Sequence, residues 1–103
     1  MTIITVFRSR LREGVEREYQ PLAGVMSMVA SSMEGFIDQK HYVAPDGERV
    51  TVVRFKDFES HRRWAKHLDH LEAQQRGRDE FYSWYDISVS EESYGHTFDN
   101  SEI

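Results

Sequence analysis

The sequence predicts a single α+β domain in which two helices cover one face of a four-stranded antiparallel sheet. Its 103 residues suit one domain. Four segments rich in β-branched and aromatic residues alternate with two segments of helical periodicity. A Pro-Asp-Gly-Glu turn at 45–48 joins two of the strand segments directly, so those two should pair as an antiparallel hairpin.

The first half of the chain predicts a strand, a helix and this hairpin. Residues 2–9 are rich in Ile, Val, Thr and Phe, and they predict the first strand. From Val15, apolar residues recur every three or four positions, which predicts a helix with one apolar stripe. Pro21 lies inside this stripe, so the helix either kinks there or begins again after it. Gly35 ends the helix, and the hairpin strands follow over 36–44 and 49–56.

The second half predicts a helix and a final strand. Asp57 can cap a helix that buries, at helical spacing, Phe58, Trp64, Ala65 and Leu68. A further turn of helix runs over 69–76 and stops at Gly77, and 81–90 form the fourth strand. We therefore expect one domain over 1–91 and a C-terminal tail over 92–103. The order is β-α-β-β-α-β, the split arrangement of ferredoxin-like folds.

Both faces of the predicted sheet are apolar. In the third strand Val50 and Val52 point one way, and Val53 and Phe55 point the other. In the fourth, one face should carry Phe81, Tyr85, Ile87 and Val89, and the opposite face Tyr82 and Trp84. Each buried apolar side chain contributes ~1.5–3 kcal/mol, so four or five of them rival the ~5–15 kcal/mol stability of a domain. Because the helices cover one face, we expect a second copy to cover the other, in a homodimer.

Composition excludes several kinds of partner. The formal net charge of −5 makes phosphate neutralisation unfavourable, so we expect no nucleic-acid binding. The acidic tail would be repelled by an anionic membrane surface, and no window reaches the ~18 apolar residues that a membrane span needs. The chain has no cysteine, which excludes disulfides and thiolate chemistry and fits a cytoplasmic protein.

Three stretches carry a resemblance to a known family. They are VTVVRFKD from Val50, FESHRRWAKH from Phe58 and HLEAQQRGRDEFY from His70, followed by a strand that ends in Ile87 and Val89. Over about 40 residues the sequence resembles the antibiotic biosynthesis monooxygenase family, whose members are dimeric α/β barrels. The resemblance implies oxidation of an electron-rich aromatic or polyketide-like substrate by molecular oxygen without a cofactor. Such chemistry needs an apolar, water-poor pocket, a proton acceptor, and donors that hold the developing anion.

The family's functional positions are only partly kept. The family tryptophan is matched by Trp64. The asparagine that quinone-forming members place one helical turn earlier falls at Ser60. Another branch degrades haem with a trio of Asn, Trp and His, and its Asn and His positions fall at Phe7 and Gln74. Haem binding or degradation stays open as an alternative.

Trp64 and His67 are the candidate catalytic residues. His67 follows Trp64 by one helical turn, and histidine is a common general base in catalysis. The candidate substrate-binding residues, between the helices and the sheet, are Arg54, Tyr85, Phe7 and Ser60. His67 and His70 could share a metal or supply a shifted haem ligand, but a metal site needs a third ligand, so we predict none. A non-enzymatic, ligand-binding or stress-responsive barrel is the third hypothesis; a lack of room beside Trp64 would favour it.

Overall fold

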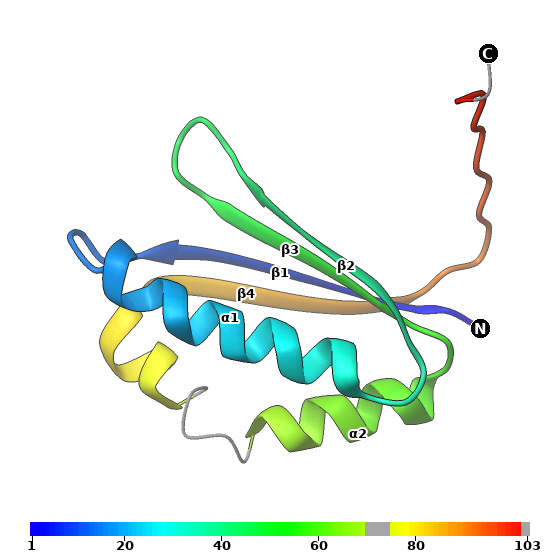
Figure 1. The fold of residues 1–103 in the computed structure, drawn as a ribbon, viewed down its shortest axis with the longest axis horizontal. Coiled ribbons are helices and arrows are strands. Elements are labelled where there is room, and N and C mark those ends of the chain that lie inside the picture. Colours follow the sequence, from blue (N-terminus) through cyan, green and yellow to red (C-terminus); the bar gives the residue numbers. More distant parts are fainter. Residues whose placement is uncertain (70–74, 102–103) are drawn as a thin grey trace.

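The computed structural model describes residues 1–69 and 75–101. Along the chain (Figure 1) it contains β1 (Ile3–Leu11), α1 (Glu16–Ser32), β2 (Phe36–Val43), β3 (Arg49–Phe55), α2 (Phe58–Asp69), a π-helical turn (Gly77–Phe81) and β4 (Tyr82–Glu91).

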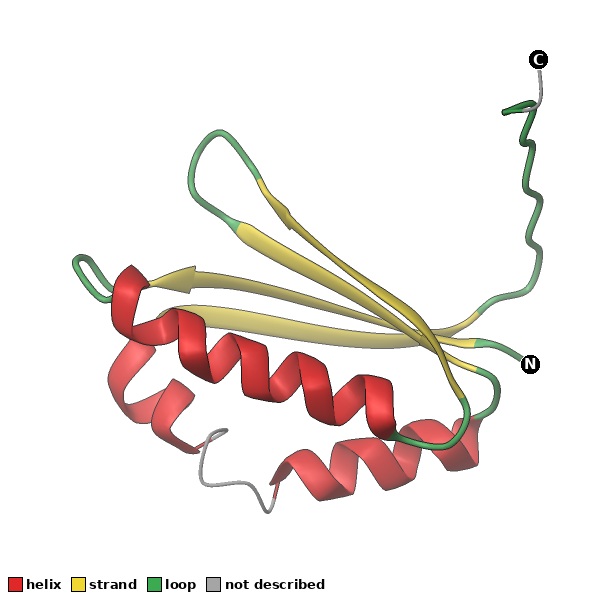
Figure 2. Ribbon diagram, viewed as in Figure 1, coloured by secondary structure: helices red, strands yellow, loops and turns green. Residues whose placement is uncertain are grey.

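The four strands form one antiparallel sheet in the order β2-β3-β1-β4. Both helices lie on the same face of this sheet, as Figure 2 shows. The predicted ferredoxin-like α+β fold is therefore confirmed. Beyond β4 the described part of the tail, to Ser101, runs away from the sheet without helix or strand (Figure 1). No helix in the described ranges is long and apolar enough to cross a lipid bilayer.

Of the two alternatives at Pro21, a restart of the helix is excluded, because α1 is one helix through that position and forgoes one backbone hydrogen bond there. Two local expectations were wrong. Phe58 is 58% exposed, because it is the first residue of α2 and its ring stacks on His61 at the surface. Gly77 does not stop the second helical segment, because the chain continues as a π-helical turn to Phe81. The predicted helix over 69–76 includes residues 70–74, which lie outside the described part of the chain, as does the side chain of Leu68.

A register shift changes which residues of β4 face the helices. The shift lies between Arg10 and Leu11 of β1 and brings Tyr82 opposite Leu11. A bulge of this kind reverses the alternation of side chains on one side of it. Tyr82 is consequently buried on the helix side against Tyr19, and the expectation that it shares a face with Trp84 was wrong.

The buried core is divided into two clusters between the sheet and the helices. One lies near the start of α1 and consists of Tyr19, Leu22, Phe81 and Tyr82. The other lies near the end of α1 and consists of Ala30, Val53, Phe55 and Trp64. Side chains do not fill the whole space between these clusters, and this gap is where the candidate site lies.

Candidate active site

A cavity of about 210 Å³ lies between the two core clusters and is walled by α1, α2 and the inner face of the sheet. Apolar side chains from the helices and from every strand form most of its wall. The polar groups in the wall are hydroxyl, amide, imidazole, indole and guanidinium groups. The polar and aromatic lining residues are Thr5, Phe7, Ser9, Tyr19, Ser27, Gln39, His41, Tyr42, Arg49, Thr51, His61, Trp64 and Tyr82.

Trp64 brings an unpaired hydrogen-bond donor to this wall. Its side chain is only 8% exposed and packs against Phe55 and His61, with ring centroids 5.2 and 5.6 Å away. Its Nε1 is buried and has no hydrogen-bond partner among the described residues. An unsatisfied buried donor costs ~1–3 kcal/mol, so an acceptor on a bound ligand would relieve that cost.

His61 is a buried imidazole one helical turn before Trp64. Its Nε2 lies 2.7 Å from Thr5 Oγ1, and this contact ties α2 to the centre of β1. Burial lowers the pKa of His61 below its ordinary value of 6.5, because desolvation disfavours the charged ring. At neutral pH the imidazole is therefore uncharged and able to accept a proton.

Two tyrosines and an arginine form the other end of the cavity. The hydroxyl oxygens of Tyr19 and Tyr82 lie 2.7 Å apart. Burial raises the pKa of both phenols above 10, so both stay protonated at neutral pH. The guanidinium carbon of Arg49 lies 5.5 Å from the centre of the Tyr19 ring.

The structure places two of the six predicted site residues at the cavity, namely Trp64 and Phe7. Tyr85 contacts the ring of Phe7 at 5.7 Å but is not part of the cavity wall. Arg54 lies on the opposite face of the sheet, where its Nη2 is 2.6 Å from Asp38 Oδ2. The structure thus does not bring Arg54 together with Trp64.

The remaining two predicted residues also lie outside the cavity. Ser60 is fully buried against Gly35, and its backbone N–H donates to Asp57 Oδ1 at 2.8 Å, which caps α2. His67 is exposed on α2. At 3.6 residues per turn, His67 is rotated one sixth of a turn from Trp64, away from the half-buried Ala65, whereas His61 is rotated by the same amount toward Ala65.

Sequence reasoning missed His61 and Arg49, although signals for both were present. For His61 the signal was helical spacing, because it lies one turn before Trp64 just as His67 lies one turn after it. For Arg49 it was strand alternation: Arg49 lies on the same face of β3 as Val53 and Phe55, which are buried in the core. Arg54 has the opposite parity.

The cavity does not fit a haem. Its 210 Å³ falls below the ~300–1,000 Å³ that pockets for drug-sized ligands occupy, and a tetrapyrrole is a larger ligand still. His67 is exposed away from the cavity, and His70 and Gln74 lie outside the described residues. Within 1–69 and 75–101 no group of three or more His, Cys, Asp or Glu could hold a metal ion. A lack of room beside Trp64 would have favoured a non-enzymatic barrel, but Trp64 borders this cavity.

Solved structures share this fold at low sequence identity. A variant of SnoaB, described as a cofactor-independent oxygenase from Streptomyces nogalater, matches with a TM-score of 0.78 and 14% identity over 91% of this chain and 95% of its own. Rv0793 from Mycobacterium tuberculosis matches with a TM-score of 0.76 and 13% identity over 94% and 100%. A candidate antibiotic biosynthesis monooxygenase from Nitrosomonas europaea matches with a TM-score of 0.72 and 8% identity over 90% and 91%.

These likenesses confirm, at the level of fold, the resemblance to antibiotic biosynthesis monooxygenases. No protein-family model matches the sequence, and no curated protein matches it. The chemistry of the site therefore has to be argued from the side chains of this chain.

Proposed function

We propose that the protein is a cofactor-independent monooxygenase that oxidises an electron-rich aromatic or polyketide-like compound with molecular oxygen. One observation carries the proposal: His61, which burial keeps neutral, and Trp64, whose buried indole N–H has no partner among the described residues, line the same largely apolar cavity. Together they supply a proton acceptor and a donor for the anion that deprotonation leaves. The shared fold with SnoaB, itself described as a cofactor-independent oxygenase, supports the proposal.

We assign the proton acceptor to His61 in place of His67, because His61 lines the cavity and His67 does not. When Thr5 Oγ1 accepts a hydrogen bond from Nε2–H, Nδ1 keeps the lone pair that takes the substrate proton. This contact with Thr5 also holds the orientation of the ring. Trp64 Nε1–H donates to the oxygen that becomes negative, and this bond is strong because the surroundings are dry.

The substrate supplies the electrons in this scheme. His61 removes the phenolic proton, and the electron-rich phenolate transfers electrons to oxygen. One oxygen atom forms a bond to a ring carbon, and the other leaves as water with the phenolic and the ring hydrogen. A phenol and O₂ thus give a quinone and water in a four-electron oxidation. The protein contributes binding, a proton acceptor and anion stabilisation.

We also infer that two copies pack through the outer face of the sheet. That face carries Val6, Val50 and Val52, all half-buried in one chain, together with Trp84, which is 42% exposed. Both helices lie on the other face (Figure 2), and no other described segment covers this one. An aromatic and aliphatic patch of this kind is typical of an interface between copies.

An oxygen electrode tests the proposed reaction. Wild-type protein treated with a chelator should consume oxygen with members of a panel of naphthols and anthrones. His61→Gln should slow this uptake by at least ~100-fold, because a positioned general base contributes 10²–10⁴-fold. His67→Gln removes an imidazole from the same helix outside the cavity and should leave the rate unchanged. Uptake no faster than in buffer across the panel, with folded protein, would rule the proposal out.

A further inference from the structure

The described residues that line the cavity include no acidic side chain, although the protein is acidic. The chain has 18 Asp and Glu against 13 Lys and Arg. Within the described ranges the cavity wall contains no Asp or Glu, and Arg49 is its one Lys or Arg. A single guanidinium in a low-dielectric cleft without acids produces a positive potential there. Such a cleft favours an anionic ligand over a neutral one of the same shape.

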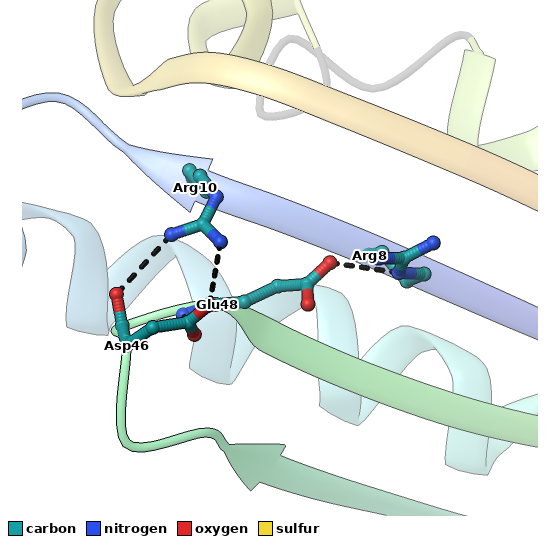
Figure 3. Close-up of polar contacts among 4 residues, drawn as sticks. All are labelled: Arg8, Arg10, Asp46 and Glu48. Atoms are coloured by element: carbon teal, nitrogen blue, oxygen red, sulfur yellow. Dashed lines mark hydrogen bonds and ion pairs between the residues drawn. The ribbon is translucent and has the colours of Figure 1, made fainter.

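Arg49 has no acidic partner among the described residues, whereas its neighbours on the sheet do. Arg8 Nε lies 2.7 Å from Glu48 Oε1, and Arg10 Nη2 lies 2.8 Å from Asp46 Oδ2. Figure 3 shows both pairs, which join β1 to the end of the β2–β3 hairpin. The acids adjacent to Arg49 in the sequence are therefore already neutralised, and the charge of Arg49 is left for a ligand.

The same pairs fix where Arg49 lies. Glu48 and Arg49 are consecutive, so an extended chain directs their side chains to opposite faces of the sheet. Glu48 is held to β1 on the outer face, and Arg49 lies on the inner face above the ring of Tyr19. Tyr19 is held in turn by its hydroxyl contact with Tyr82. A guanidinium held in place in this way is suited to bidentate recognition of a planar carboxylate.

The dimensions of the cavity limit the size of the ligand. Its volume of about 210 Å³ is small for a ligand site. Arg49 is four residues along β3 from Val53, which packs in the cluster of Trp64. At 3.3 Å per residue this places the cationic and the donor ends of the cavity roughly 13 Å apart. The space between suits one or two aromatic rings.

We propose that the cavity selects aromatic carboxylates: a one- or two-ring hydroxylated compound whose carboxylate is bound by Arg49 while its phenol lies at Trp64 and His61. This inference rests on the proposed function for the reaction and adds the class of substrate. Arg49 is then the specificity-determining residue, because it distinguishes a carboxylate from an uncharged group at the same ring position.

Calorimetric titration of the full chain tests the selectivity without requiring turnover. The probes are 6-hydroxy-2-naphthoate, whose phenol and carboxylate lie at opposite ends of its two rings, and its neutral carboxamide. Wild-type protein should bind the carboxylate at least tenfold more tightly than the amide. Arg49→Gln should abolish this difference, and Arg49→Lys should restore part of it. Arg54→Gln is the matched control: it removes an arginine from the same strand on the opposite face and should keep the wild-type preference.

Equal affinity of the wild type for the two probes would overturn the inference, and so would a preference that survives in folded Arg49→Gln. If circular dichroism shows that Arg49→Gln does not fold, the affinities of the wild type and of Arg49→Lys for the two probes decide whether Arg49 selects the carboxylate. Carboxylate selectivity without oxygen uptake would contradict the proposed reaction alone. Oxygen uptake with 1-naphthol and no carboxylate selectivity would contradict the role of Arg49 alone.

Discussion

Trp64 combines a packing role with an unpaired donor, and one substitution separates the two. Trp64→Phe keeps an aromatic ring against Phe55 and removes the buried N–H. The lost packing is offset by the ~1–3 kcal/mol that an unsatisfied donor costs, so we expect the free energy of unfolding in urea to change by less than about 1 kcal/mol. Turnover should fall ~10²–10³-fold, as for the loss of one anion-stabilising donor. A large loss of stability with full activity would contradict this assignment.

His61 gives a pH dependence whose direction follows from its burial. Its folded pKa is lowered from 6.5, so the unfolded chain binds the proton more readily than the folded one. The stability from neutral His61 is present above pH ~6.5 and is lost as pH falls through the folded pKa. His61→Gln should reduce the drop in urea stability between about pH 7.5 and pH 5. The pKa of His41 is lowered in the same direction, so part of the drop should persist. His67→Gln should leave the drop as in the wild type; an unchanged drop in His61→Gln would contradict the burial argument.

Residue type alone does not say whether a side chain of α2 or β3 points into the cavity; that depends on the direction in which it projects from its helix or strand. Trp64 could be placed because an aromatic on the apolar stripe of a helix faces the sheet. His61 and His67 lie at equal spacing from Trp64, and the choice between them required knowing which side of the stripe is buried. Arg54 was expected to bind the anion because it is a cation on a hairpin strand, but the alternation within β3 places Arg49 on the inner face and Arg54 on the outer face.

At the level of elements, the turn between α1 and β2 packs tightly on the start of α2. Gly35 has a φ of +87°, and a methyl group at its Cα would collide with the side chain of Ser60. Gly47, in the hairpin turn, also has a positive φ of +91° but has open space around it. Gly47→Ala should therefore cost ~1–2 kcal/mol from backbone strain. Gly35→Ala should cost ~1–3 kcal/mol more, because the added methyl group also collides with the Ser60 side chain. Urea denaturation of the two variants measures the difference, and equal losses would contradict the close packing.

Element positions were predictable where periodicity is strong and failed where the chain departs from it. The hairpin followed from its turn residues, and β1, β3 and α1 from their apolar patterns. The bulge between Arg10 and Leu11 left no such pattern, so Tyr82 was placed on the wrong face of β4. The π-helical turn at 77–81 begins with glycine, which ordinarily ends a helix, so it was not expected either.

At the scale of the whole molecule, the inferred dimer depends on the outer face of the sheet. Val6→Glu places a carboxylate at the centre of that face. Water can solvate this charge in a single chain, but packing of two chains would bury it without a partner. Multi-angle light scattering should give twice the 12.2 kDa chain mass for the wild type and a single chain mass for Val6→Glu. Met28→Glu adds the same charge on the exposed side of α1 and should remain dimeric. A wild type that scatters as one chain at micromolar concentration would contradict the interface.

The global architecture was predictable because local pattern, turn chemistry and strand order all agree with one fold. A pocket between the helices and the sheet, with Trp64 in its wall, was expected from the family resemblance. Most of its lining was not, because the cavity arises where two core clusters fail to meet, and no linear pattern encodes which side chains border such a gap. Its polar lining comes from both helices and from all four strands, so no single stretch of the sequence contains it.

Isotope labelling tests the central chemistry most directly. Chelator-treated protein would be given ¹⁸O₂ and a phenolic substrate that it turns over, and the product would be analysed by mass spectrometry. The proposed mechanism predicts one ¹⁸O atom per product molecule, with the second atom recovered as labelled water and formation suppressed in His61→Gln. Product oxygen derived from H₂¹⁸O under ¹⁶O₂, or labelled product formed equally fast by His61→Gln, would contradict it.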